Sequence, residues 1–312
     1  MANAFVGTAE LLQLGDGNIS DIDVSELLEE APFLKVLSAI EASHETSHEW
    51  LKKTAAPGAG FRAVNDGREN TKATYTKVTQ ALKLFDASFA IDLAVAMLPS
   101  GDALRRREAK DHLMASFAAM EAQVFYGTGA DSDGFAGFAN EATVDKKDDA
   151  MVVDATGTSV GAATSVWAVR VGEEAVSAVY GKGATIEIGE EYQTVLEGSS
   201  TGTYDAMRTP ILFWGGVQIA TSLDLGRIVN LTAQSGKTLT DDLIIELISK
   251  FPAGRGPTHL VMNRQSQKQL QQSRTATNET GAPAPLPSES HNVPIVVTDQ
   301  ISSTEAIVAA TA

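Results

Sequence analysis

Residues 99–129 read PSGDALRRREAKDHLMASFAAMEAQVFYGTG and carry the strongest structural signal in the chain. The opening Pro-Ser-Gly-Asp supplies helix-capping residues, and the closing Gly-Thr-Gly is typical of a helix C-terminus. Between them, apolar side chains recur at i, i+4, i+7 and i+11, the spacing of one helical face: Leu113, Phe117, Met120 and Val124. The pattern predicts a helix over residues 102–126, roughly 36 Å long, with these side chains in a core.

The segment upstream of this helix, residues 47–85, has a different pattern. Pro-Gly and Asp-Gly dipeptides at 57–58 and 66–67 are turn signals, and the Thr and Tyr residues around 73–79 favour β-strand. We therefore expect a long two-stranded excursion. Its apolar residues follow no periodic pattern, so it cannot bury much surface against its own domain and needs a neighbouring surface to become ordered.

Charge is distributed unevenly around the start of this excursion. Residues 10–49 carry many carboxylates and the single base Lys35, whereas residues 52–83 carry many bases and only the acids Asp66 and Glu69. Complementary surfaces that meet within one subunit or between subunits would explain this division. Two solvated faces of no consequence would explain it as well.

The remaining segments predict an α+β fold with one long helix and segregated sheets. Near the start, a short helix is expected at residues 23–28, and a second from Pro32 with Phe33, Leu37 and Ile40 on one face. A strand is expected to lead up to the turn at Pro99. Alternating and apolar runs then indicate strands at 166–171, 185–188, 211–231, 259–262, 293–297 and 306–309, helices at 241–251 and 263–272, and a loop at 275–290.

The composition excludes several classes of protein. The chain has 312 residues, a formal net charge of −16, a pI near 4.7 and no cysteine, which removes disulfides, thiolate nucleophiles and cysteine metal sites. The acidity argues against a nucleic-acid-binding surface over most of the chain, although it suits a container whose lining must not hold phosphates. No apolar run approaches the roughly 18 residues that span a bilayer, and residues 89–98 contain Asp92.

The sharpest enzymatic signal is HETSH at residues 44–48, which matches the H-E-x-x-H pattern of zinc peptidases. On a helix this spacing places His44 and His48 on one face with Glu45 as general base, and Glu69 stands at a workable distance for a third ligand. The turns that follow leave no second helix to close such a site. We therefore expect both histidines to be polar residues at the root of the excursion that bind no metal, with a zinc peptidase as the alternative.

Two glycine-containing motifs have simpler interpretations. Residues 235–238, SGKT, match the end of a phosphate-binding loop, but the residues before them are not glycine-rich, so we interpret them as a turn. The pattern Gly-x-Gly-x-Asp-x-Asp-Gly at 127–134 suggests a cation loop but lacks the spacing and distal glutamate of an EF-hand, so helix capping is the better interpretation. We expect no cofactor, no metal and no catalytic residue.

In chain order, a series of short stretches resembles the major capsid proteins of tailed double-stranded DNA bacteriophages. Residues 47–52 (SHEWLK) and 56–67 (APGAGFRAVNDG) resemble their extended loop. Residues 85–94 resemble the strand that leads to their spine helix, and FYGTG at 125–129 resembles the end of that helix. Further matches, which extend the resemblance over nearly the whole chain, lie at 134–138, 165–167, 180–181, Tyr204, Arg208, 214–216, 227–230 and 261–264.

This resemblance implies the Hong Kong 97-type capsid fold and its division into parts. Those parts are an N-terminal arm at 1–46, an extended β loop at 47–86, a peripheral domain at 87–140 with the spine helix at 102–126, a β-rich peripheral and axial region at 141–235, and a mixed axial domain with the final strands at 236–312. The loop residues that the resemblance makes candidate inter-subunit contacts are Phe61, Arg62, Arg68, Lys72 and Lys77.

The function that the resemblance implies is structural and not enzymatic. Copies of the chain would assemble as hexamers and pentamers into an icosahedral shell around packaged double-stranded DNA, without sequence-specific binding and without a membrane. Assembly in the host bacterial cytoplasm, a place in the virion, and portal, scaffolding and decoration proteins as partners are implied too. The short arm points to a separate scaffolding protein or none. The subunit of an encapsulin-like nanocompartment is the alternative with the same fold.

Overall fold

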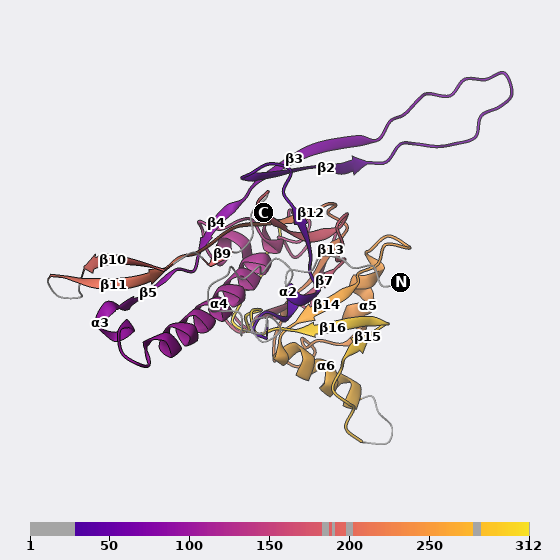
Figure 1. Ribbon diagram of the computed structural model, residues 1–312. Helices are drawn as coiled ribbons and strands as arrows, with labels where there is room; N and C mark the ends of the chain where they lie inside the picture. Colours follow the sequence, from indigo (N-terminus) through magenta and orange to yellow (C-terminus); the bar gives the residue numbers. More distant parts are fainter. Residues whose placement is uncertain (1–28, 183–186, 189–190, 198–201, 277–281, 312) are drawn as a thin grey trace, which may run out of the picture.

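The computed structural model describes residues 29–182, 187–188, 191–197, 202–276 and 282–311. Figure 1 shows a body crossed by the long helix α4 (Gly101–Tyr126) and a thin ribbon, β2 (Ser47–Ala55) and β3 (Thr74–Ala81), that projects from it. On the other side a lateral sheet projects, formed by β5 (Phe89–Asp92), β10 (Tyr192–Glu197) and β11 (Thr203–Thr209). The helix expected at residues 23–28 lies outside the described residues.

Helix α4 begins one residue before the predicted start and ends at the predicted residue. Ser100 occupies the N-cap, but its side chain makes no capping hydrogen bond, contrary to the expectation; its carbonyl accepts from the Leu104 N–H at 3.0 Å. At the C-terminal end Gly127 adopts a φ of +53°, and a Cβ there would lie 1.8 Å from Asn140 Oδ1. Glycine is therefore required where the helix stops, since any side chain would collide with the returning chain.

The largest sheet has six strands in the order β15-β16-β14-β7-β13-β6. They are β6 (Val152–Asp154), β7 (Thr164–Val169), β13 (Leu225–Leu231), β14 (His259–Met262), β15 (Glu289–Ser290) and β16 (Val293–Val297). Every residue of β7 and β13 is buried, so the alternation in the β7 sequence does not mark a solvent-facing side. Helix α5 (Asp241–Ser249) packs on β13 and β6, while α6 (Arg264–Ala276) follows β14 directly.

A second sheet has the order β1-β8-β12-β4, with β9 (Glu187–Ile188) also paired to β12. Its other strands are β1 (Ser38–Glu41), β4 (Lys83–Asp86), β8 (Val176–Tyr180) and β12 (Ile211–Ile219). Strand β1 corrects the expected helix through Ile40: helix α2 (Pro32–Val36) stops early, and Leu37 already has extended backbone angles. Ile40 pairs with Val179 in a parallel ladder, which suits a β-branched residue.

Two further expectations are wrong. Residues 93–96, expected to continue a strand, form the short helix α3 (Leu93–Ala96), because the Asp92 carboxylate accepts from the Ala94 N–H at 2.8 Å and caps a helical turn. Residues 306–309 form no strand. Glu305 makes an isolated bridge to Ala163, and the Val308 N–H donates to the side chain of Asn230 at 2.8 Å. A side-chain partner thus replaces a strand ladder at the end of the chain.

One hydrophobic cluster joins α2, α4 and the largest sheet. The stripe residues of α4 all belong to this cluster and are at most 8% exposed: Leu113, Phe117, Met120 and Val124. Two short 3₁₀ turns after α4, at Gly127–Gly129 and Phe138–Asn140, return the chain to the same core. Among the helices of the described ranges, none is long and apolar enough to cross a membrane.

Phe117 tests the position of this core. Phe117 is 2% exposed, so Phe117→Ala should lower the free energy of unfolding of the unassembled subunit by about 3–5 kcal/mol. Arg107→Ala on the exposed part of the same helix should change it by about 0.5 kcal/mol or less. Urea titration followed by circular dichroism measures both. Equal effects of the two substitutions would show that the stripe is not core.

Candidate inter-subunit interface

The ribbon receives almost no support from its own subunit. Among the residues that the structure describes, strands β2 and β3 pair only with each other, in antiparallel register, and residues 56–73 connect them. Every residue from 53 to 72 is exposed. A two-stranded ribbon is at best marginally stable in water, so the outer half of this segment gains little free energy from folding of the subunit itself.

The root of the ribbon, in contrast, is fixed to the body by polar contacts. The His48 ring is buried; its Nε2 lies 2.6 Å from Gln218 Oε1, and its Nδ1 accepts from the Ser43 N–H at 3.2 Å. The Lys52 ammonium lies 2.6 Å from the Glu141 carboxylate, and both side chains are largely shielded from solvent. These contacts set the direction in which the ribbon leaves the body.

The same geometry answers the question of the H-E-x-x-H pattern. His48 lies in β2 and His44 in the bend before it, so no helix brings the two imidazoles onto one face. Both ring nitrogens of His48 already have polar partners. In the described part of the chain, no group of His, Asp and Glu side chains has the arrangement of a metal site. The two histidines lie at the root of the excursion, and His48 holds it there.

The tip of the ribbon presents apolar side chains to solvent. Phe61 is fully exposed and Val64 is 89% exposed. A turn closes the tip, with the Asp66 N–H donating to the Ala63 carbonyl at 3.3 Å and Asn65 at a φ of +67°. The centre of the turn, residues 64 and 65, therefore lies two residues earlier than the Asp-Gly dipeptide at 66–67 predicts. Exposed apolar patches rimmed by polar residues mark interaction sites, and Phe61 and Val64 lie beside the charged residues Arg62 and Asp66.

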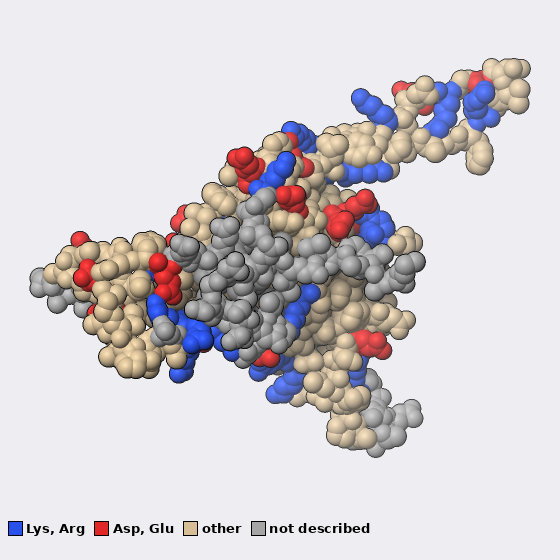
Figure 2. Space-filling view, viewed as in Figure 1, with Lys and Arg blue, Asp and Glu red and all other residues tan. Residues whose placement is uncertain are grey.

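The four candidate bases of the loop differ in the partners that they have within their own subunit. Lys77 lies in β3 and pairs within the ribbon, with its Nζ 2.5 Å from Glu49 Oε2; the Lys77 hydrogen bond lowers the pKa of Glu49. Arg62 donates to the Asp66 carbonyl at 2.9 Å. Arg68 and Lys72 form no ion pair with any described residue. Figure 2 shows the resulting row of Lys and Arg side chains along the outer part of the ribbon.

Helix α4 holds the start of the described chain through Glu121. This carboxylate is buried and accepts from the backbone N–H groups of Phe33 at 2.9 Å and Leu34 at 3.2 Å, and the Thr298 hydroxyl donates to it as well. Burial raises the pKa of Glu121 to about 7, against the opposing effect of these hydrogen bonds. A single side chain thus joins α2, α4 and the segment after β16.

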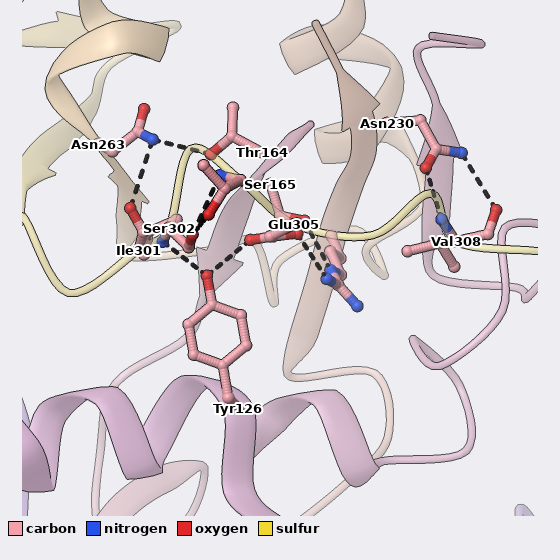
Figure 3. A network of polar contacts seen from close by, with 11 residues as sticks. Tyr126, Thr164, Ser165, Asn230, Asn263, Ile301, Ser302, Glu305 and Val308 are labelled. Atoms are coloured by element: carbon pink, nitrogen blue, oxygen red, sulfur yellow. Dashed lines mark hydrogen bonds and ion pairs between the residues drawn. The ribbon is translucent and has the colours of Figure 1, made fainter. Parts of the chain in front are cut away.

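The last residues of the chain are fixed by a second polar network (Figure 3). The Glu305 carboxylate accepts from Tyr126 at 2.7 Å, from Ser165 at 2.6 Å and from Arg227 at 3.1 Å. Arg227 also lies 4.6 Å from the ring centroid of Trp167, in a cation–π arrangement. Burial, and next the Glu305 charge, raise the pKa of the Tyr126 hydroxyl well above its usual range, so that it remains a donor.

Sequence patterns did not reveal these anchoring residues. Glu121 carries a weak signal, because it is a charged residue beside Met120 and four positions after Phe117, on the apolar side of α4. Arg227 and Glu305 carry no such signal, since their partners lie in segments that are distant in the sequence. Gln218, the partner of His48, carries a weak signal like that of Glu121, because it is a polar residue in an otherwise apolar run.

Comparisons with known proteins agree with this architecture. A family model described as major capsid protein GP7 matches residues 15–309. A near-atomic structure of bacteriophage Epsilon15 is similar with a TM-score of 0.64 and 15% sequence identity, over 88% of this chain and 88% of that one. This similarity confirms the expected Hong Kong 97-type fold. No curated protein matches the sequence.

Two weaker similarities were found as well. The procapsid of bacteriophage JBD30 gives a TM-score of 0.45 at 11% identity, over 88% of this chain and 94% of that one. The SrpI encapsulin complex from Synechococcus elongatus PCC 7942 gives 0.43 at 9% identity, over 65% and 88%. With TM-scores below 0.5, neither decides between a phage shell and a nanocompartment.

The histidine geometry predicts the metal content of the protein. Because His44 and His48 share no helical face, chelator-washed protein should contain no stoichiometric zinc by atomic absorption, and adding zinc should not raise its melting temperature. Stoichiometric zinc that disappears in the double variant His44→Ala, His48→Ala would contradict this geometry.

Glu121 should make stability depend on pH. Its folded-state pKa of about 7 lies above its ordinary value of 4.5, so the fold favours the protonated form. The contribution of protonated Glu121 to the free energy of unfolding is complete below about pH 4.5 and is lost as the pH rises through about 7. The free energy of unfolding should fall over this range by at most about 3 kcal/mol. Glu121→Gln keeps a carbonyl acceptor for the α2 N–H groups and should remove this dependence. Urea titrations between about pH 5 and pH 8 measure it; parallel curves for the two proteins would contradict the assignment.

Proposed function

Because this chain belongs to the family of major capsid protein GP7, and is thus a structural subunit of a bacteriophage capsid, we propose that its ribbon lies across a neighbouring copy of the chain in the shell. The observation that carries this proposal is that every residue from 53 to 72 is exposed and that the segment projects beyond the body without a core of its own. The free energy that orders them then comes from assembly.

The different contacts made by the root and by the tip of the ribbon support this role. His48 and Lys52 fix the root to the body of the subunit, so the outer half leaves in a defined direction. Phe61 and Val64 offer apolar surface at the tip, and burying a side chain of this size contributes roughly 1.5–3 kcal/mol. A shell repeats the contact at every copy, so a modest contact between two subunits becomes a large term for the particle.

Charge supports the same contact. The chain has a net charge of −16, whereas bases outnumber acids in the outer ribbon, which carries Lys53, Arg62, Arg68 and Lys72 against Asp66 and Glu69. A basic projection from an acidic protein finds favourable partners over much of the surface of a second copy. We propose that these bases face carboxylates of the neighbour, and that Lys77, already paired with Glu49, contributes less than the sequence suggests.

The wider role is that of a shell around DNA. We propose that copies assemble as hexamers and pentamers into an icosahedral particle, in the host bacterial cytoplasm, and that the particle encloses double-stranded DNA without sequence-specific contacts. The acidic composition supports this, since a strongly basic lining would hold the phosphates. Portal, scaffolding and decoration proteins are the proposed partners. The part played by the chain is structural, and we propose no catalytic one.

Replacing residues 57–72 with a short Gly-Ser linker tests the role of the ribbon. The variant should keep the circular dichroism and urea midpoint of the wild-type subunit, because the removed residues touch no core, but it should no longer form closed particles. Negative-stain microscopy and sedimentation measure assembly. The control replaces the exposed turn at residues 160–162 with Gly and Ser in the same way and should assemble normally.

Two outcomes would contradict the proposal. Closed particles of normal size from the linker variant would show that the ribbon is not needed between subunits. An unfolded linker variant would place the ribbon inside the folding unit of its own subunit.

A further inference from the structure

A groove lies at the root of the ribbon, on the body of the subunit. It encloses about 320 Å³ between the second half of α4, strands β4 and β12, and residues 130–135. Its apolar lining includes Met120 from the helix, Phe135 from the loop and the rings of Phe85 and Phe213, whose centroids are 5.1 Å apart. This volume is at the lower end of pockets that accept a ligand group, and suits one aromatic side chain and its neighbours.

The border of the groove is predominantly acidic. Asp131 and Asp133 line it and are exposed. Neither carboxylate forms a salt bridge with another described residue, and the one internal contact between them is the hydrogen bond from the Asp133 N–H to Asp131 Oδ1 at 2.9 Å. Lys83 is the opposing charge in the lining. An apolar groove with unpaired carboxylates at its border fits a partner that combines an aromatic group with cations.

The tip of the ribbon has this combination, but the tip of the same subunit cannot reach the groove. Strand β4 follows β3 almost directly, so the groove lies at the root, whereas Phe61 is 14 residues beyond Ser47. At about 3.3 Å per extended residue the tip is some 45 Å from the root, and the β2–β3 ladder holds it there (Figure 1). The tip of a second copy has no such restriction.

We propose that the tip of the ribbon of one copy inserts Phe61 into the groove of a second copy, with Arg62 and Arg68 beside Asp131 and Asp133. This inference rests on the proposed function and makes it specific, because it names both halves of the contact. The groove excludes water from the Phe61 ring, while the carboxylates at its border select a tip with flanking cations. Arg62 reaches them as a second donor while its bond to the Asp66 carbonyl holds the turn.

Cysteine cross-linking tests the contact directly, because the chain contains no cysteine. The test pair is Ala63→Cys with Ala119→Cys, which leaves Phe61 in place; Ala63 is an exposed residue of the tip, and Ala119 is an exposed residue in the groove lining. The control pair is Ala63→Cys with Leu98→Cys, which places the second thiol on an apolar residue that is 55% exposed near the lateral sheet. Both pairs leave the buried core unchanged. Purified particles are treated with a short bis-maleimide reagent and run on denaturing gels.

In closed particles the test pair should convert most of the monomer band into covalent multimers, and the control pair should leave it monomeric. A test pair that stays monomeric in closed particles, or a control pair that links as well, would overturn the inference and leave the proposed function standing. Particles in which the ribbon proves dispensable, as in the linker variant, would instead overturn the proposed function and this contact together.

Charge reversal provides a second readout that does not depend on thiol geometry. Arg62→Glu with Arg68→Glu should lose closed particles, and Asp131→Lys with Asp133→Lys should lose them too. Combining all four substitutions in one chain should restore assembly, because the pairing is then reversed and intact. If the combined variant assembles no better than either half, the assignment of these partners is wrong.

Discussion

Both ends of the described chain are attached to one helix. Near its C-terminal end α4 presents Glu121 to the N–H groups of α2, and one turn later Tyr126 to the segment that carries Glu305. The buried stripe of the same helix fixes it against the largest sheet, and Gly127 lets the chain turn back where a side chain would collide with Asn140. The body is therefore closed by long-range polar contacts that meet at a single helix, whereas the ribbon takes its direction from the contacts of His48 with Gln218 and of Lys52 with Glu141.

The arrangement separates two kinds of stability. The body has a continuous core, and buried charged groups such as Glu121 and Arg227 have partners in it, so we expect it to be stable as an isolated subunit. The ribbon has a root that is fixed to the body and an outer half that makes no core contacts. This combination suits a contact between copies, because the ribbon leaves the body in a defined direction and its outer half is stabilised only when it meets another copy. His48 and Gln218 lie at the junction of the body and the ribbon. Both side chains are buried in the body, and the contact between them fixes the root of the ribbon.

Local patterns in the sequence predict those elements whose structure is decided locally. Helix α4, strands β14 and β16 and the two-stranded excursion follow from periodicity, caps and turn residues. Three misses share a cause, which is that a distant partner decided the outcome, whereas α3 follows from the local cap by Asp92. Ile40 becomes a strand residue because β8 offers a parallel edge, β7 is covered on both faces by other parts of the chain, and Val308 bonds to an Asn230 side chain instead of a strand. The groove is harder still to predict from the sequence, since its lining comes from segments before, within and after α4.

The exposure of residues 53–72 also has an evolutionary consequence. Under the proposed contact, a substitution there should change the folding of the subunit little, so selection would act on it through the surface that receives the tip in another copy. Sequence change in the tip is therefore free to accumulate as long as the receiving surface changes with it. Lineages that diverge in this way would build shells whose subunits no longer mix, and two capsids with nearly the same backbone would remain separate assemblies inside one infected cell.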